Sequence, residues 1–241
     1  MHVLGDLVAR ERRSDRPALR TAGGRRYSYH DFCTTSYKAG NFLRYLGVRA
    51  GDTVAVEPDP LPEPILTFFG AVQLGAATRF DPSVSRRSDT AGEEPPRATV
   101  VPVDRESAFS LPPGHKLAVY GGSPESPQVA HWEQEVWSEN PAFPPTEVDP
   151  ASAALVGDDG AASHETLLAA ARRVVAETGL GDHDEVAVRA SLSEPAVVVA
   201  GVLAPLLAGA TVVFPAADEV CDVAVGDGPE ELVVDPESLD V

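Results

Sequence analysis

One pattern occurs twice in this chain and decides its fold: residues 47–58 read GVRAGDTVAVEP, and residues 179–190 read GLGDHDEVAVRA. In each copy a glycine ends a stretch of helical periodicity, a charged turn follows, and a short Val-Ala-Val strand comes next. Each copy then continues through a proline-flanked apolar helix into a Gly-Ala strand, which reads FGAVQLGAATRF at 69–80 and LAPLLAGATVVF at 203–214. The sequence therefore repeats one αβαβ unit.

The two units extend over residues 28–82 and 163–216. Strands that alternate with helices imply parallel sheets joined by crossovers. We therefore predict an α/β protein with two similar αβαβ lobes, whose mostly parallel sheets are flanked by helices. The best internal boundary is a proline-rich linker at residues 140–150, NPAFPPTEVDP. It separates a first lobe with additional strands, residues 1–139, from a second lobe, residues 151–241, and leaves open whether both pack as one globular unit.

Local signals place the individual helices and strands. A capping box at Ser28 and Asp31 begins a helix that Gly47 ends, and the prolines of residues 58–64 indicate a rigid loop. Residues 83–97 are polar and turn-rich, which is typical of a surface connection, and the N-terminus reads as a short amphipathic helix ending in charge. Further helices are expected at 65–74, 131–139, 163–178 and 195–208, and strands at 53–57, 76–80, 99–103, 116–120, 153–156, 222–225 and 232–234.

The composition is globular and strongly acidic. The 241 residues are 43% hydrophobic and carry a formal net charge of −18. This charge excludes nonspecific nucleic-acid binding through basic patches, because no cluster of cations could neutralise the phosphates. The cations are 17 arginines and two lysines, Lys38 and Lys116. Many carboxylates with almost no lysine indicate a halophilic protein adapted to concentrated salt; an acidic protein from a GC-rich genome is the alternative.

Two features bear on the compartment. Residues 195–217 hold 23 residues without a charge, a length that would span a bilayer, but Pro205 and the β-branched run after Gly209 favour a helix that turns into a buried strand. Cys33 and Cys221 show neither disulfide nor metal spacing, and the N-terminus has no apolar core of secretory length. We expect a cytoplasmic protein with no membrane contact.

Residues 27–82 resemble the opening of the adenylate-forming (AMP-binding) superfamily, which includes acyl-CoA synthetases, luciferases and peptide-synthetase adenylation domains. The resemblance rests on Tyr27-Ser28-Tyr29 before the first helix, on LGVRAGDTVAV at 46–56 and on FGAVQLGA at 69–76. Residues 149–214 are similar to the central region of the same family. The resemblance implies the fold of the family's amino-terminal domain and, for an active member, acid–thiol ligase chemistry with ATP, Mg²⁺ and CoA.

The chain departs from the family between two of these motifs. DPASAALV at 149–156 resembles the strand before the family's phosphate loop, and SHETLL at 163–168 resembles the helix after it. The family's loop is rich in Thr, Ser and Gly and ends in Pro-Lys-Gly, whereas residues 157–162 read GDDGAA, which is typical of a tight turn between two short strands. Backbone amides and a cation are what hold a phosphate, so we expect phosphate binding to be lost here.

Electrostatics point the same way. Each carboxylate about 4 Å from a phosphate charge costs roughly 4 kcal/mol at an effective dielectric near 20. Concentrated salt would screen that repulsion, but it cannot restore missing donors. Family members are usually about twice this length, and their later half supplies the magnesium ligand, the ribose contact and a lid lysine. Lys38 and Lys116 match none of these, so no catalytic residue is predicted.

Other candidates are weak. Ser163 and His164 are the remaining cofactor-binding candidates, because His164 falls at the family's post-loop histidine; its ordinary interpretation is a polar residue at a helix start. The pair Asp158 and Asp159 could hold a hydrated cation, but a solvated turn is the simpler interpretation, and no metal site is predicted. Gly121-Gly122-Ser123 resembles a phosphate turn but lacks a following helix. Trp132 and Trp137 are predicted to be core or lobe-packing residues rather than a base-stacking platform.

These features favour a shortened, non-catalytic relative of AMP-dependent acyl-CoA synthetases with a structural, regulatory or partner-binding role. No cofactor is then expected, and a protein partner or a second copy could cover the surface left by the missing half. The main alternative is an acyl- or aryl-acid adenylating ligase subunit completed by a separate chain, which would use ATP, Mg²⁺ and CoA. A third possibility is a pocket that binds an acyl or CoA-like ligand without activating it.

Overall fold

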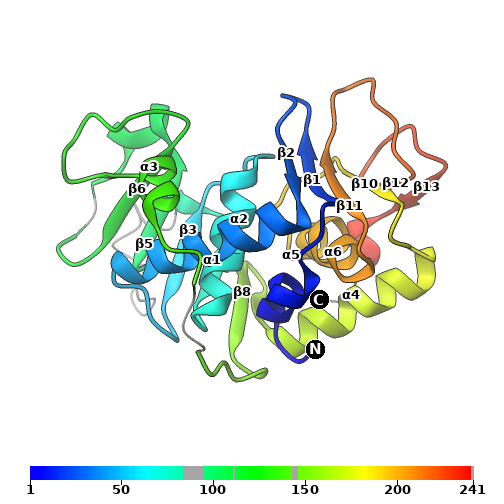
Figure 1. The fold of residues 1–241 in the computed structure, drawn as a ribbon, viewed down its shortest axis with the longest axis horizontal. Helices are drawn as coiled ribbons and strands as arrows, with labels where there is room; N and C mark the ends of the chain where they lie inside the picture. The colour runs from blue at the N-terminus through cyan, green and yellow to red at the C-terminus, as the bar shows by residue number, and fades with distance from the viewer. Residues whose placement is uncertain (84–94, 111, 143–145, 240–241) are drawn as a thin grey trace.

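The structure is a computed structural model that describes residues 1–83, 95–110, 112–142 and 146–239. The described residues form two β-sheets with helices packed on their faces, so the predicted α/β class with mostly parallel sheets is confirmed. Figure 1 shows the two sheets on either side of the central helices. Most of the surface connection predicted at 83–97 lies outside the described residues.

Each sheet draws strands from both halves of the chain. The six-stranded sheet is ordered β13 (Leu232–Val234), β12 (Val223–Val225), β10 (Glu185–Val188), β11 (Thr211–Phe214), β1 (Pro17–Thr21) and β2 (Arg26–Ser28). The seven-stranded sheet is ordered β7 (Ala130–His131), β6 (Lys116–Tyr120), β5 (Ala98–Pro102), β3 (Thr53–Val56), β4 (Ala77–Arg79), β8 (Ala153–Gly157) and β9 (Gly160–Ser163). Within these two sheets the neighbours are parallel, apart from the antiparallel hairpins β1–β2 and β8–β9.

The opening hairpin of each half adds to the sheet of the other half. Strand β1 pairs with β11, with Leu19 opposite Val212, and β8 pairs with β4, with Leu155 opposite Thr78. The strand orders correspond position by position, because β2-β1-β11-β10-β12-β13 matches β9-β8-β4-β3-β5-β6, and β7 is the extra strand. The repeat in the sequence is therefore a pair of pseudo-symmetric units that exchange hairpins.

The helices begin and end close to the predicted residues. They are α1 (Tyr29–Tyr45), α2 (Pro62–Gln73), α3 (Trp132–Ser138), α4 (His164–Thr178), α5 (Pro195–Val198) and α6 (Ala204–Ala208), with 3-10 turns η1 (Leu4–Val8), η2 (Arg10–Arg12), η4 (Val103–Ala108) and η6 (Pro236–Ser238). The Ser28 hydroxyl caps α1 by accepting the N–H of Asp31 at 3.1 Å. Gly179 ends α4 in the left-handed conformation, with φ of 71°.

Three local details differ from what the sequence predicts. Helix α2 begins at Pro62 rather than at residue 65, since prolines fit the first helical turn, where the N–H has no intrahelical acceptor. The short amphipathic helix predicted at the N-terminus has 3-10 geometry, since η1 buries Leu4, Leu7 and Val8 and the charged turn η2 follows it. Strands β1 and β2 were not predicted, because their stability comes from pairing with the distant strand β11.

The charge-free stretch at 195–217 is a helix that turns into a strand, as predicted. Between α5 and α6 lies a π-helical turn, η5 (Val199–Leu203), directly before Pro205, which has no N–H to continue the regular helical ladder. Strand β11 follows Gly209. In the described ranges no helix combines the length and apolar character that a bilayer crossing needs.

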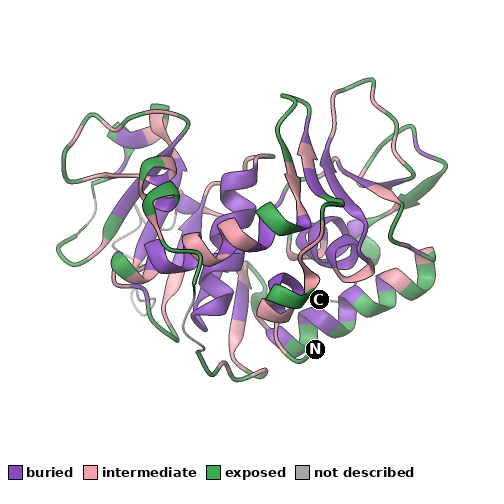
Figure 2. Cartoon of the chain, viewed as in Figure 1, coloured by how far each residue is buried: buried purple, intermediate pink, exposed green. Residues whose placement is uncertain are grey.

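The core centres on the contact between α1 and α2. Buried residues line the facing surfaces of the helices and both sheets (Figure 2). A Cβ atom added to Gly70 of α2 would lie 2.7 Å from the backbone nitrogen of Gly40 in α1, so the helices approach as closely as glycine allows. Phe69 packs edge-on against Phe32 across this contact, with ring centroids 5.4 Å apart. Helices α1 and α2 therefore pack closely at the centre of the core.

Candidate functional site

The hairpin β8–β9 replaces the phosphate loop expected from the resemblance. Its strands pair with Gly157 opposite Gly160, so Asp158 and Asp159 alone form the turn. Gly160 has φ of 131°, a conformation that favours glycine. The predicted tight turn between two short strands is confirmed. Two carboxylates stand at its tip.

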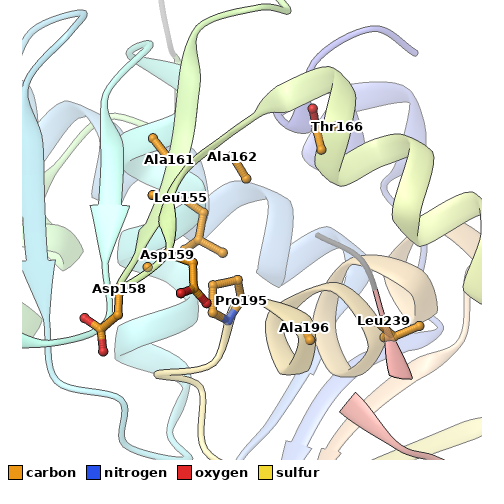
Figure 3. Close-up of a pocket in the computed structure, with 11 residues that line it drawn as sticks. Leu155, Asp158, Asp159, Ala161, Ala162, Thr166, Pro195, Ala196 and Leu239 are labelled. Atoms are coloured by element: carbon orange, nitrogen blue, oxygen red, sulfur yellow. The ribbon is translucent and has the colours of Figure 1, made fainter. Parts of the chain in front are cut away.

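A hollow of about 280 Å³ lies beside this hairpin (Figure 3). The hairpin forms one wall, Thr166 at the start of α4 forms a second, and Pro195 and Ala196 at the start of α5 form a third. The charged groups of the lining are Asp158 and Asp159, and none of the lining residues is basic. Such a lining suits a neutral or cationic group and repels a phosphate.

Arg79 reaches the hairpin from the end of β4, because β4 and β8 are neighbouring strands. Its Nη2 lies 2.9 Å from Oδ1 of Asp158, whose side chain is 94% exposed. An ion pair with so exposed a partner contributes less than about 1 kcal/mol. Arg79 does not line the hollow, so its charge offsets that of Asp158 and does not create an anion site.

Ser163 and His164 lie at the start of α4, as predicted, but neither faces the hollow. The Ser163 hydroxyl caps the helix by accepting the N–H of Thr166 at 3.2 Å. His164 is fully buried, and its Nδ1 accepts the N–H of Leu4 at 3.2 Å. Burial lowers the pKa of His164 to about 4. The histidine is thus a neutral core residue beneath η1, and both residues have structural partners.

Ion pairs occupy the places at which open α/β sheets bind ligands. Ligands of such sheets bind at the carboxyl ends of the strands where the strand order reverses, here between β3 and β5 and between β10 and β12. At the first place Arg105 pairs with Glu57, which directly follows β3. At the second, Nη2 of Arg189, which directly follows β10, lies 2.5 Å from Oε1 of the buried Glu230. The two pairs hold equivalent positions with the charges exchanged.

The carboxylates of these two pairs, half-buried Glu57 and buried Glu230, respond differently to their surroundings. The hydrogen bond from Arg189 lowers the pKa of Glu230 below its usual value. Burial raises the pKa of Glu57, and the charges of Asp59 and Asp81 add to that rise. Arg189 and Glu230 therefore form a firmly ionised buried pair.

Gly121-Gly122-Ser123, the sequence that resembles a phosphate turn, follows β6. Backbone amides in and just after this turn donate to carboxylates of the protein. The N–H of Gly121 donates to Glu133 at 2.6 Å. The N–H groups of Glu125 and Ser126 donate to the two oxygens of Glu106 at 2.8 and 2.9 Å. Donors that could hold an anion are thus engaged within the fold.

The tryptophans divide between core and surface. Trp132 is buried, and its Nε1 donates to the hydroxyl of Thr67 at 2.9 Å, as a core residue should. Trp137 is 70% exposed, so its predicted core or lobe-packing role is wrong. Across the described part of the chain, no three His, Cys, Asp or Glu side chains gather as a metal site would require.

Sequence reasoning missed Pro195, Ala196 and Leu239 as walls of the hollow and Arg79 as a partner of the turn. Each meets the hairpin through tertiary packing over tens of residues. The charge-free run after Pro195 predicts a buried helix, but it does not predict that the first turn of this helix lines a hollow beside the hairpin.

Comparisons with known proteins agree with this fold. A model of the AMP-binding enzyme family matches residues 7–80. No curated protein matches the chain. Similar solved structures include the anthranilate CoA ligase AuaEII in complex with anthranoyl-AMP, with a TM-score of 0.79 and 19% identity over 93% of this chain and 49% of that one. The predicted resemblance to adenylate-forming enzymes is confirmed.

Two further structures show the same relation. Apo MatB from Rhodopseudomonas palustris has a TM-score of 0.75 and 16% identity, covering 93% of this chain and 48% of that chain. The N-terminal domain of FACL13 from Mycobacterium tuberculosis has a TM-score of 0.74 and 15% identity, covering 94% of this chain and 63% of that chain. The chain therefore has the amino-terminal fold of these ligases and spans about half the length of the full-length ones.

Proposed function

We propose that this chain, which shares its fold with the amino-terminal half of AMP-dependent CoA ligases, is a non-catalytic relative with a structural, regulatory or partner-binding role. The observation that carries the proposal is the two-residue turn of Asp158 and Asp159 where the family's phosphate loop is expected. Adenylation depends on positioning and electrostatic stabilisation of the transferring phosphoryl group. A two-residue acidic turn offers neither a cation nor hydroxyl donors for that task.

The ion pairs at the strand ends support the same proposal. Arg105–Glu57 and Arg189–Glu230 fill the crevices in which a doubly wound sheet would receive a ligand. An ion pair buried in such a crevice stabilises the scaffold only while both partners are present, because a single buried charge is strongly destabilising. The chain accordingly needs no cofactor in this role.

A partner-binding role is supported by the edge strand β13. Leu232 is 39% exposed and Val233 is 44% exposed, and β13 is the last strand of the six-stranded sheet. An apolar edge strand invites pairing or covering by another chain. A protein partner or a second copy is the occupant we propose for this edge.

A second candidate function is an acyl- or aryl-acid adenylating ligase subunit completed by a separate chain, which would bring ATP, Mg²⁺ and CoA into use. It is favoured by the fold that this chain shares with CoA ligases. ATP–pyrophosphate exchange distinguishes the two functions. Exchange that appears only when a second purified chain is added supports the ligase subunit.

The proposal is tested by thermal shift with Mg·ATP, acyl-CoA and free carboxylic acids in molar KCl. We expect ATP to stabilise the Asp158→Asn/Asp159→Asn double variant no more than the wild type, because removing the repulsion at the hairpin supplies no phosphate donor. Stabilisation by acyl-CoA or acids alone would support a pocket that binds without activating, by the usual linkage. Pyrophosphate exchange by the purified chain alone would overturn the non-catalytic proposal.

A further inference from the structure

A second hollow, of about 600 Å³, lies on another face of the molecule, between η2, the start of α1 and the end of α6. It shares no lining residue with the hollow beside the hairpin. Its lining includes three arginines from one short segment, ARERRSDR at residues 9–16, together with Ser14 and Tyr29. The proposed function leaves this basic segment of an acidic chain unused.

Six arginines of the described residues form ion pairs with carboxylates. These pairs are Arg16–Asp182, Arg20–Glu185, Arg20–Glu219, Arg25–Glu63, Arg79–Asp158, Arg105–Glu57 and Arg189–Glu230. Arg12 and Arg13 form no such pair among the described residues, although both are half-buried. In a chain with 37 acidic and 19 basic residues, the question is then what satisfies these two adjacent, half-buried charges.

Arg12 has a structural explanation. Its Nη2 donates to the carbonyl oxygens of Leu206 and Leu207 in the last turn of α6. Cations stabilise the carboxyl end of a helix through its dipole and its unpaired carbonyls. Only its Nε is buried without a partner.

Arg13 has no comparable explanation. Its guanidinium lies 5.6 Å from the ring centroid of Tyr37, which holds the group in place without supplying a hydrogen-bond acceptor. Its Nε and Nη2 are buried without a partner among the described residues, as is the hydroxyl of Ser14. A buried donor without an acceptor destabilises a fold, and a bound molecule that accepts hydrogen bonds is one way in which such a donor is satisfied.

Arg16 completes the arrangement. Its guanidinium lies 5.9 Å from the ring centroid of Tyr29, and its Nη1 donates to Oδ2 of Asp182 at 2.6 Å. The hollow thus holds three arginines against two carboxylates, Glu11 and Asp182, a net charge of +1. Asp182 is already paired, and Glu11 is exposed, so neither carboxylate neutralises Arg13.

We propose that this hollow binds a phosphate-class oxyanion carried by a small soluble molecule, with Arg13 as its principal ligand and Ser14 and Arg16 beside it. Guanidinium groups bind phosphate through paired, charge-assisted hydrogen bonds. The tyrosine rings hold Arg13 and Arg16 in position, so little side-chain freedom is lost on binding. The anion supplies the acceptors that Arg13 and Ser14 lack within the fold.

The test is thermal shift and calorimetry with inorganic phosphate that replaces chloride at constant ionic strength. We expect phosphate to raise the melting temperature of the wild type, and Arg13→Gln to weaken phosphate affinity about tenfold or more. Arg10→Gln is the matched control, since Arg10 is exposed, lies in the same segment and loses the same charge. It should bind phosphate as the wild type does.

Two outcomes would overturn the proposal: no phosphate-dependent shift in the wild type, or equal losses in Arg13→Gln and Arg10→Gln, which would indicate general charge attraction. Circular dichroism of Arg13→Gln separates lost binding from lost folding, and Arg13→Lys, which keeps the charge but not the paired donors, should bind with intermediate affinity. A failure here leaves the hairpin proposal intact, because the two hollows share no residue.

Discussion

His164 is a buried imidazole whose two nitrogens have different surroundings. Nδ1 accepts the N–H of Leu4, and Nε2 is buried with no hydrogen-bond partner among the described residues. With Nδ1 as acceptor, the neutral ring carries its proton on Nε2. Protonating Nδ1 would break the contact that holds η1 onto α4. The residue is therefore a structural link between the N-terminus and the second half of the chain.

Acid should destabilise the fold through this histidine. Its pKa is about 4 in the folded chain, against an ordinary value of 6.5, so the unfolded state binds more protons between these values. The free energy of unfolding then falls as the pH is lowered from 6.5 to 4, by on the order of 3 kcal/mol, and is unaffected above pH 7. We expect urea unfolding of His164→Gln to lose this part of the pH dependence.

His183 provides the control, because its side chain is 90% exposed. His183→Gln should keep the wild-type pH profile of unfolding. If the His164→Gln profile ran parallel to that of the wild type between pH 4 and 6.5, His164 would not be the buried neutral group described here.

Residue-scale chemistry was only partly predictable. The cap formed by Ser163 and the helix start at His164 followed from local sequence. The burial of His164 did not, because Leu4 lies 160 residues away in the chain. Asp158 could not be predicted as the partner of Arg79 for the same reason, because the two residues are far apart in the chain.

The α1–α2 contact is the tightest packing between helices in the core. A Cβ atom on Gly70 would lie 2.7 Å from N of Gly40 and 2.8 Å from C of Ala39, both backbone atoms that cannot move independently. Gly70→Ala should therefore lower the free energy of unfolding by about 1–3 kcal/mol, although alanine favours helices. Denaturant unfolding measures this. Gly23→Ala, where the nearest atom would lie at 3.8 Å, should change stability little, and equal effects would contradict the packing described.

The buried pair Arg189–Glu230 at the end of β10 should contribute far more to the free energy of unfolding than the exposed pair Arg79–Asp158 at the hairpin. Glu230→Gln leaves the buried charge of Arg189 without its carboxylate partner and should cost about 3–5 kcal/mol of unfolding free energy. Asp158→Asn removes an exposed partner and should cost less than about 1 kcal/mol. Chemical denaturation of both variants checks the contrast. Comparable losses of unfolding free energy in the two variants would contradict the description of Arg189–Glu230 as a buried ion pair.

Elements with strong local signals were predicted well. Strands β6 and β13 lie at the predicted residues, and α3 is one residue shorter at each end. Strands β1 and β2 were missed, since a three- to five-residue segment is stabilised by its neighbours rather than by its own propensity. Proline at residues 62 and 64 was interpreted as a loop although both fit a first helical turn.

At the scale of the whole molecule, the hairpin exchange joins the two halves. Each sheet contains a hairpin from the other half, so the repeat is visible in the sequence while its interlocking is not. Which sheet an opening hairpin joins depends on pairing between strands far apart in the chain, such as β1 with β11 and β8 with β4. The boundary predicted at residues 140–150 remains a prediction.

The charge of the whole chain predicts a dependence on salt. With 37 acidic and 19 basic residues, self-repulsion should destabilise the compact state at low ionic strength and be screened in molar KCl, where the Debye length falls to about 3 Å. We expect the urea concentration at the midpoint of unfolding to rise between about 0.1 M and about 2 M KCl, because the added salt screens the repulsion. An unchanged midpoint would favour a GC-rich genome as the origin of the arginine-rich composition.

The most direct test of the central claim is calorimetric titration of Mg·ATP into the purified chain, in parallel with Arg13→Gln. We predict that Arg13→Gln does not bind ATP. The acidic turn of the hairpin has no group that binds the phosphates of ATP, and any weak binding by the wild type takes place at the arginine-lined hollow. Micromolar ATP affinity that is retained in Arg13→Gln would contradict the account.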